Sequence, residues 1–177
     1  GANFLIYGEI HGIQENAHVI YTLVHQLGIQ RIAVEASPSV ESFISLASQG
    51  EYDFSRIDTD IFDSSVVSIE VAKTLATLLR ERTLQEVVYI DTYFDNLTPE
   101  DMDDPDSPQK REQDLADNIL SLSPDKKTLC ILGQWHTQPE RVPQEGGKFH
   151  LSALYRIRQR VSDIPFVHNL YRSGQLY

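Results

Sequence analysis

Five short apolar runs, separated by segments with helical periodicity, constrain the fold of this chain more than any other feature. The runs lie at residues 3–8, 31–35, 86–90, 127–132 and 165–170. Continuous apolar runs of about four to eight residues are typical of strands that are covered on both faces. The pattern therefore predicts an α/β fold, a mostly parallel sheet with helices on both faces. We expect the first strand to be central and the last to lie at an edge.

The segments between the runs carry helical spacing and helix end signals. Apolar residues recur with helical spacing from Ile13 to Leu27, and Gly28 is a natural terminator. Proline is favoured in the first turn of a helix, and Asp63 or Ser64 is a suitable N-cap for the longest helix. The predicted helices span residues 13–27, 38–48, 66–82, 108–122 and 151–161.

Length and composition indicate one globular domain, residues 1–177. Hydrophobic residues make up 41% and charged residues 23% of the chain. The formal net charge of −11 disfavours nucleic acid and anionic membrane surfaces, which require clustered Lys and Arg. No apolar run approaches the roughly 20 residues of a membrane span. We therefore expect a soluble protein with no integral membrane segment.

The compartment and the redox chemistry are constrained by two further features. We expect no signal peptide in the chain, which would place the protein in the cytoplasm, or in the periplasm if a leader has been removed. Cys130 is the only cysteine, so an intrachain disulfide and Cys-rich metal sites are excluded. It lies within an apolar run, where a buried thiol is usually inert.

Polar residues follow each of the first four apolar runs. Gly8-Glu9-Ile10-His11-Gly12 follows the first, Glu35 ends the second, Asp91 follows the third, and Gly133-Gln134-Trp135-His136 follows the fourth. In open α/β sheets, ligands bind beyond the carboxyl ends of the strands. The sequence therefore predicts one polar site at this edge. Its central residues are Glu9, His11, Glu35 and His136.

Other polar residues have less certain roles. Glu15 is equally well explained as a supporting residue of the site or as a surface acid, since it lies near the first helical turn. His18, His25, His150 and His168 are better explained as structural or exposed residues.

The four central residues allow two kinds of chemistry. Histidine and carboxylate side chains are ligands of divalent metals such as zinc, so the set could hold a metal ion. Without a metal, a histidine could act as general base towards water while a glutamate orients it. The chain contains no HExxH, GxSxG, P-loop or GxGxxG sequence.

These residues, taken in order, resemble the superfamily of erythromycin esterase, ChaN, TraB and the Tiki proteases. GEIHG at 8–12 and GQWH at 133–136 resemble the GExHG and GNxHA motifs of its ChaN-like branch, and residues 111–118 resemble its RDxxMAxN segment. The resemblance adds Asp91 and Arg111 to the site as supporting residues. The chain departs from the branch in three ways: no Arg at 63–68, Glu112 instead of Asp, and a bulky Trp135.

The resemblance implies a common site with divergent uses. We expect a hydrolase of ester, lactone or amide bonds, acting on a small-molecule or peptide substrate. His11 or His136 would be the general base, and Arg111 would stabilise negative charge. The first alternative is a haem- or iron-binding protein, with Tyr7, Trp135 and His168 as candidate contacts. The second is a catalytically degenerate binding module. The oligomeric state stays open.

Overall fold

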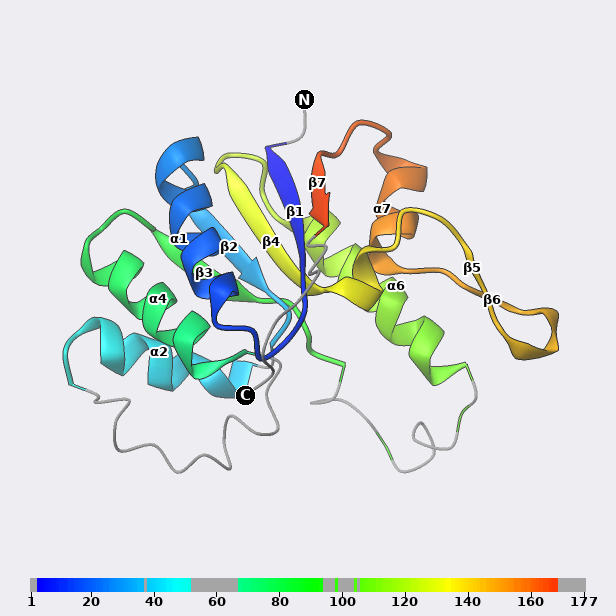
Figure 1. Ribbon diagram of the computed structural model, residues 1–177, viewed down its shortest axis with the longest axis horizontal. Helices are drawn as coiled ribbons and strands as arrows, with labels where there is room; N and C mark the ends of the chain where they lie inside the picture. The colour runs from blue at the N-terminus through cyan, green and yellow to red at the C-terminus, as the bar shows by residue number, and fades with distance from the viewer. Residues whose placement is uncertain are drawn as a thin grey trace.

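A five-stranded parallel sheet organises the molecule. The computed structural model describes residues 3–36, 38–51, 67–93, 98, 104 and 106–168, apart from the side chain of residue 39. The strands follow the order β3-β2-β4-β1-β7, and every neighbouring pair is parallel. Their bounds are β1 Phe4–Glu9, β2 Arg31–Val34, β3 Glu86–Tyr89, β4 Thr128–Gly133 and β7 Phe166–His168. The predicted α/β class is confirmed (Figure 1).

The strand order corrects one prediction. β4 is the middle strand, whereas β1 lies between β4 and β7. β4 takes this place because all six of its residues are buried and apolar or small, so it can be paired on both edges and covered on both faces. β7 is an edge strand, as predicted.

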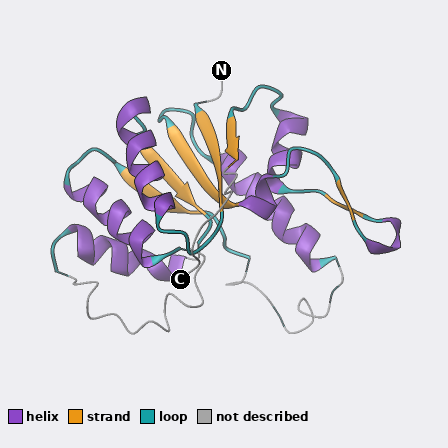
Figure 2. Ribbon diagram, viewed as in Figure 1, coloured by secondary structure: helices purple, strands orange, loops and turns teal. Residues whose placement is uncertain are grey.

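Helices cover both faces of the sheet (Figure 2). One face carries α1 Glu15–Leu27, α2 Glu41–Ser48 and α4 Ile69–Arg80, which pack on side chains such as Tyr7, Ile32 and Ile131. The other carries α6 Ser107–Ser121 and α7 Ala153–Arg160, which pack on Ile6, Ala33 and Leu132. Alternate residues of each strand point to opposite faces, which divides the core into these two halves.

Local signals explain the helix ends. Gly28 adopts a left-handed conformation with φ of 62° and ends α1 as expected. α4 begins later than predicted because the Ser68 side chain accepts a hydrogen bond from the Val71 N–H and caps the helix. The predicted caps Asp63 and Ser64 lie outside the described residues. Pro38 lies in a 3-10 turn, Pro38–Val40, that leads into α2.

The segment after β4 forms a turn and a small hairpin. Residues 134–137 form a 3-10 turn, η4. Strands β5 Val142–Pro143 and β6 Phe149–His150 then pair antiparallel as a small hairpin. Gly146 and Gly147 both have positive φ angles between these strands, a conformation that lets the chain reverse.

The chain leaves adjacent strands β2 and β4 in opposite directions. β2 leads to α2 and α4 on one face, whereas β4 leads to α7 on the other. The two connections diverge at the carboxyl ends of these strands, and such a point is where open α/β sheets place their ligands. Among the described helices, none is both long and apolar enough to cross a membrane.

Candidate functional site

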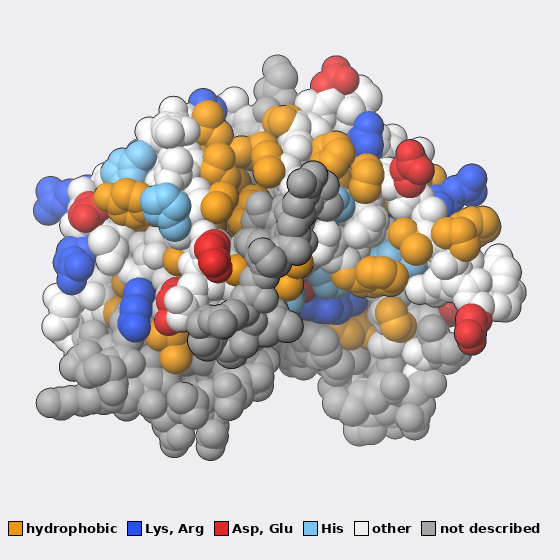
Figure 3. All heavy atoms as spheres, in the orientation of Figure 1, with side chains coloured by type: hydrophobic (Ala, Val, Ile, Leu, Met, Phe, Trp, Pro, Cys, Tyr) orange, Lys and Arg blue, Asp and Glu red, His pale blue; other side chains and the backbone are white. Residues whose placement is uncertain are grey.

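Six of the seven predicted site residues meet at the carboxyl edge of the sheet. Glu9, Glu35, Asp91 and His136 are buried there, and His11 lies at the surface of the same edge. Arg111 reaches them from α6. In the space-filling view, basic and histidine side chains lie together near the lower middle of the molecule (Figure 3). Glu15 differs: it is an exposed acid in the first turn of α1.

Arg111 joins the ends of β2 and β3. Its Nη2 donates to Glu35 Oε1 at 2.6 Å and to Asp91 Oδ2 at 2.7 Å. Burial lowers the pKa of Arg111, but Asp91, Glu35 and Glu112 outweigh this and raise it. Asn118 of the same helix donates to the Ile90 carbonyl at 2.9 Å and so fixes the end of β3 that precedes Asp91.

His136 lies between two buried carboxylates. Its Nδ1 is 2.7 Å from Glu112 Oε1, and its Nε2 is 3.0 Å from Glu35 Oε1. Burial alone lowers the pKa of His136, but the bonds and charges of Glu112 and Glu35 outweigh it and raise the pKa to about 9. His136 is therefore an imidazolium at neutral pH. Its 3.3 Å contact with Arg111 Nη1 joins two cations that share Glu35.

Glu35 is the centre of this network. Burial raises its pKa, but His136, Arg111 and the Gly133 N–H, which donates to Oε2 at 2.6 Å, lower it overall. Glu35 is therefore a carboxylate that accepts three bonds from groups on β4, η4 and α6. It thus joins the end of β2 to β4, η4 and α6.

Glu9 and His11 form a second, more open pair. His11 Nδ1 is 3.1 Å from Glu9 Oε1, and the His11 side chain is 41% exposed. Burial, assisted by the charge of Glu35, raises the pKa of Glu9 against the opposing effect of His11. The other oxygen of Glu9, Oε2, is buried without a hydrogen-bond partner in the described part of the chain.

Gly133 lets His11 approach the network closely. A Cβ at this position would lie 2.5 Å from His11 Nε2 and 3.4 Å from Glu35 Oε2. The imidazole of His11 thus rests on the backbone next to Glu35. Gly12 has a φ of 78°, which turns the chain from His11 into the approach to α1.

Asn16 supports the loop of His11, a role that the sequence suggested for Glu15. The Asn16 amide donates to the Ile10 carbonyl at 2.8 Å, and its oxygen accepts from the Tyr7 hydroxyl at 2.9 Å. Asn16 is buried because it lies on the helical face that also buries Ile20 and Val24. That spacing was a signal in the sequence for its inward position.

Tyr7 and His168 do not fit their predicted role as exposed ligand contacts. Tyr7 is completely buried in the core beneath α1, because it lies on the inner face of an interior strand. His168 Nε2 is 2.6 Å from the Thr137 hydroxyl, and both side chains crowd the place where Gly8 lacks a Cβ. Only Trp135 of the three is largely exposed, at 51%.

Glu112 and His150 complete the network, although neither was predicted as a site residue. Glu112 Oε2 accepts from the Ala153 N–H at 2.6 Å, and its Oε1 lies 3.2 Å from His150 Nε2 without hydrogen-bond geometry. Burial lowers the pKa of His150. Glu112 precedes the buried Leu115, Ala116 and Ile119 by three, four and seven residues. This spacing indicated a buried acid, which needs a partner.

The described residues do not assemble a metal site. They contain no group of three or more His, Cys, Asp or Glu side chains arranged to hold a metal ion. Both nitrogens of His136 are already paired with carboxylates, so this residue offers no lone pair to a metal. The four predicted ligands lie close together, but they interact with one another and with Arg111.

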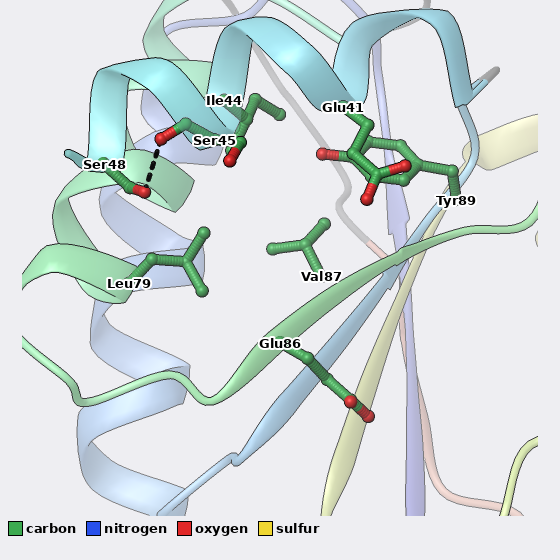
Figure 4. A pocket seen from close by; sticks show the side chains of 8 residues that line it. All are labelled: Glu41, Ile44, Ser45, Ser48, Leu79, Glu86, Val87 and Tyr89. Atoms are coloured by element: carbon green, nitrogen blue, oxygen red, sulfur yellow. Dashed lines mark hydrogen bonds between the residues drawn. The ribbon is translucent and has the colours of Figure 1, made fainter. Parts of the chain in front are cut away.

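A separate groove runs along the edge strand β3, beneath α2 and α4. It is lined by Glu41, Ile44, Ser45, Ser48, Leu79, Glu86, Val87 and Tyr89 (Figure 4). Burial, together with the charge of Glu41, raises the pKa of Tyr89. The groove contains none of the histidines or arginines of the network, so we do not assign the chemistry to it.

Comparisons with known proteins assign no family. The chain matches no known protein family, and no curated protein matches it significantly. A solved structure described as "Cofacial heme binding to ChaN of Campylobacter jejuni" is similar in fold. It has a TM-score of 0.49 and 11% sequence identity, and the alignment covers 99% of this chain and 84% of that one. Similarity at this level leaves the function to be inferred from the site itself.

Proposed function

We propose that this protein hydrolyses a carbonyl bond of an ester, lactone or amide, with His11 as general base. The observation that carries the proposal is the Glu9–His11 pair at the open rim of a buried charge network. A carboxylate that accepts from Nδ1 leaves the lone pair on Nε2, which is the arrangement required to take a proton from water.

In this proposal His136 is not the general base, although the sequence offered it as one. A general base needs a free lone pair, whereas both nitrogens of His136 face carboxylates and its pKa is about 9. We therefore assign it, with Arg111, to electrostatic stabilisation. Arg111 is the more accessible of the two, since 18% of its side chain is exposed against 9% for His136.

The proposed reaction has two proton transfers. Water attacks the carbonyl carbon while His11 Nε2 takes one proton from it, and a tetrahedral oxyanion forms. Arg111 and the imidazolium of His136 supply the positive potential that favours this charge. The intermediate collapses, the C–O or C–N bond breaks, and His11 returns its proton to the leaving alcohol or amine. Glu9 holds the imidazole in the required orientation throughout.

The decisive experiment compares His11→Ala with the wild type on a panel of esters, lactones and peptides. Loss of a general base should lower kcat by about 10²-fold or more. His25→Ala is a matched control, because His25 is an exposed histidine on α1. A wild type that turns over no member of the panel, or a His11→Ala variant of unchanged activity, would contradict the proposal.

Haem binding is the second candidate, and the exposed Trp135 is the observation that favours it. A planar aromatic ligand could stack on an open indole face. Titration with haem, followed by the Soret band, separates the two functions. A band shift that Trp135→Ala abolishes would support haem binding, and no shift at micromolar haem would remove it.

A further inference from the structure

Trp135 is a large apolar side chain that is exposed beside the charge network. It belongs to η4, directly before the buried His136, yet it is 51% exposed. Exposing an indole to water forgoes the free energy of its burial, and tryptophan is enriched where proteins bind partners. Its position next to a polar site therefore points to contact with a ligand.

The ring of Trp135 is held in place from one side. It stacks on the imidazole of His150, with ring centroids 4.7 Å apart and planes 30° from parallel. His150 is buried, and its Nδ1 lies 3.2 Å from Gln109 Nε2. The turn that carries Trp135 is closed by bonds from Thr137 and Gln138 to the Gln134 carbonyl. A ring fixed in this way loses little conformational freedom when a ligand binds.

The same contacts connect Trp135 to the network. Glu112 Oε1 lies 3.2 Å from His150 Nε2 and 2.7 Å from His136 Nδ1. The residue that supports the indole and the imidazolium of the network thus meet at one carboxylate oxygen. A group that stacks on Trp135 therefore lies beside the turn η4, which also carries His136 of the network.

We propose that Trp135 is the specificity-determining residue of this site and that its exposed face binds an aromatic ring of the ligand. The proposal rests on the proposed function in so far as this ligand is a substrate. In that case the charge network would bind the carbonyl group of the ligand, and Trp135 would select a flat, π-rich group near it by stacking.

Fluorescence tests the binding step directly, because Trp135 is the only tryptophan in the chain. Titration with phenylacetate should shift the emission of the wild type to the blue, since a bound ring excludes water from the indole. Cyclohexylacetate, which has a ring of similar size without a π face, should produce a smaller shift. An emission spectrum that neither compound changes would overturn the proposal.

Turnover tests selectivity in parallel. The ratio of kcat/KM for ethyl phenylacetate to that for ethyl cyclohexylacetate should fall about fivefold in Trp135→Leu and stay near the wild-type value in Trp135→Phe. Tyr21→Ala, which removes an exposed aromatic ring on α1, should leave the ratio unchanged. An unchanged ratio in Trp135→Leu would overturn the proposal.

The two proposals fail separately. A blue shift without turnover of any ester, lactone or peptide upholds Trp135 as an aromatic binding face and removes the hydrolase. Turnover without any change in Trp135 emission upholds the hydrolase and removes the aromatic face.

Discussion

Each end of the sheet holds an arginine between two carboxylates, but the surroundings of the two arginines differ. Arg31 lies at the amino end of β2, and Arg111 lies at the carboxyl end of the same strand. Arg31 pairs with Glu86 and Asp125, whose side chains are 35% and 59% exposed. Arg111 pairs with Glu35 and Asp91, whose side chains are only 2% and 3% exposed.

The two ends of the sheet also differ in whether their buried polar groups have hydrogen-bond partners. Arg31 also donates to the Ser123 carbonyl at 2.7 Å, a bond that ties the chain before β4 to the sheet. At the other end, Asp91 Oδ1 and Glu9 Oε2 are buried without hydrogen-bond partners in the described part of the chain. Unpaired buried oxygens cost stability, and they are typical of places where a protein binds something. The two ends therefore differ in how far their buried polar atoms are paired, and the proposed function is placed at the end where two carboxylate oxygens are left without partners among the described residues.

The largest effect on stability should come from Arg111→Met. This substitution leaves Glu35 and Asp91 buried without their shared cation, which costs about 3–5 kcal/mol of unfolding free energy. Arg31→Met should cost less, about 1–2 kcal/mol, because water can hydrate its more exposed partners. Denaturant unfolding of both variants measures the difference. Equal losses of unfolding free energy in the two variants would contradict the distinction between the two ends of the sheet.

The pH dependence of stability should be the next largest effect. Because the pKa of His136 is raised to about 9, its contribution is complete below the unfolded value of about 6.5 and disappears as the pH rises through 9. The shift corresponds to about 3 kcal/mol. Unfolding curves measured across this range should show the loss, and Glu112→Gln should reduce it. A flat profile in the wild type would contradict the assignment of His136 as an imidazolium.

The two arginines should also differ in their effect on kcat. Arg111→Lys keeps the charge but loses the fork that reaches both Glu35 and Asp91, so we expect kcat to fall about tenfold or more. Arg31→Lys should leave kcat unchanged, since Arg31 lies at the opposite end of the sheet. Steady-state kinetics on the best substrate of the panel measures both. A loss of kcat in Arg31→Lys that matched the loss in Arg111→Lys would show that the two ends are coupled.

Surface ion pairs should give the smallest effect. Lys148 Nζ lies 3.4 Å from Asp106 Oδ1, and both side chains are largely exposed. Lys148→Ala should change the unfolding free energy by about 0.5 kcal/mol or less. Thermal unfolding at two salt concentrations provides the measurement. A larger loss of unfolding free energy would show that this exposed pair contributes to stability as much as a buried pair does.

The sequence pattern predicts the strands of the main sheet, the helices between them and the edge at which polar side chains collect. Short apolar runs form strands because their backbone groups must pair when both faces are buried, and polar residues then follow at one edge. Glu9, His11, Glu35, Asp91, Arg111 and His136 were all predicted to lie there, and the structure brings them together.

Which of these residues face one another depends on packing between distant parts of the chain, and the protonation of each depends on that packing. The strand order placed β4 between β1 and β2, and the packing of α6 turned Glu112 towards His136. A pKa depends on burial and on neighbours that are distant in sequence, such as Glu35 and Glu112 around His136. Local sequence patterns do not identify such neighbours, so the different roles proposed for His11 and His136 rest on the three-dimensional structure.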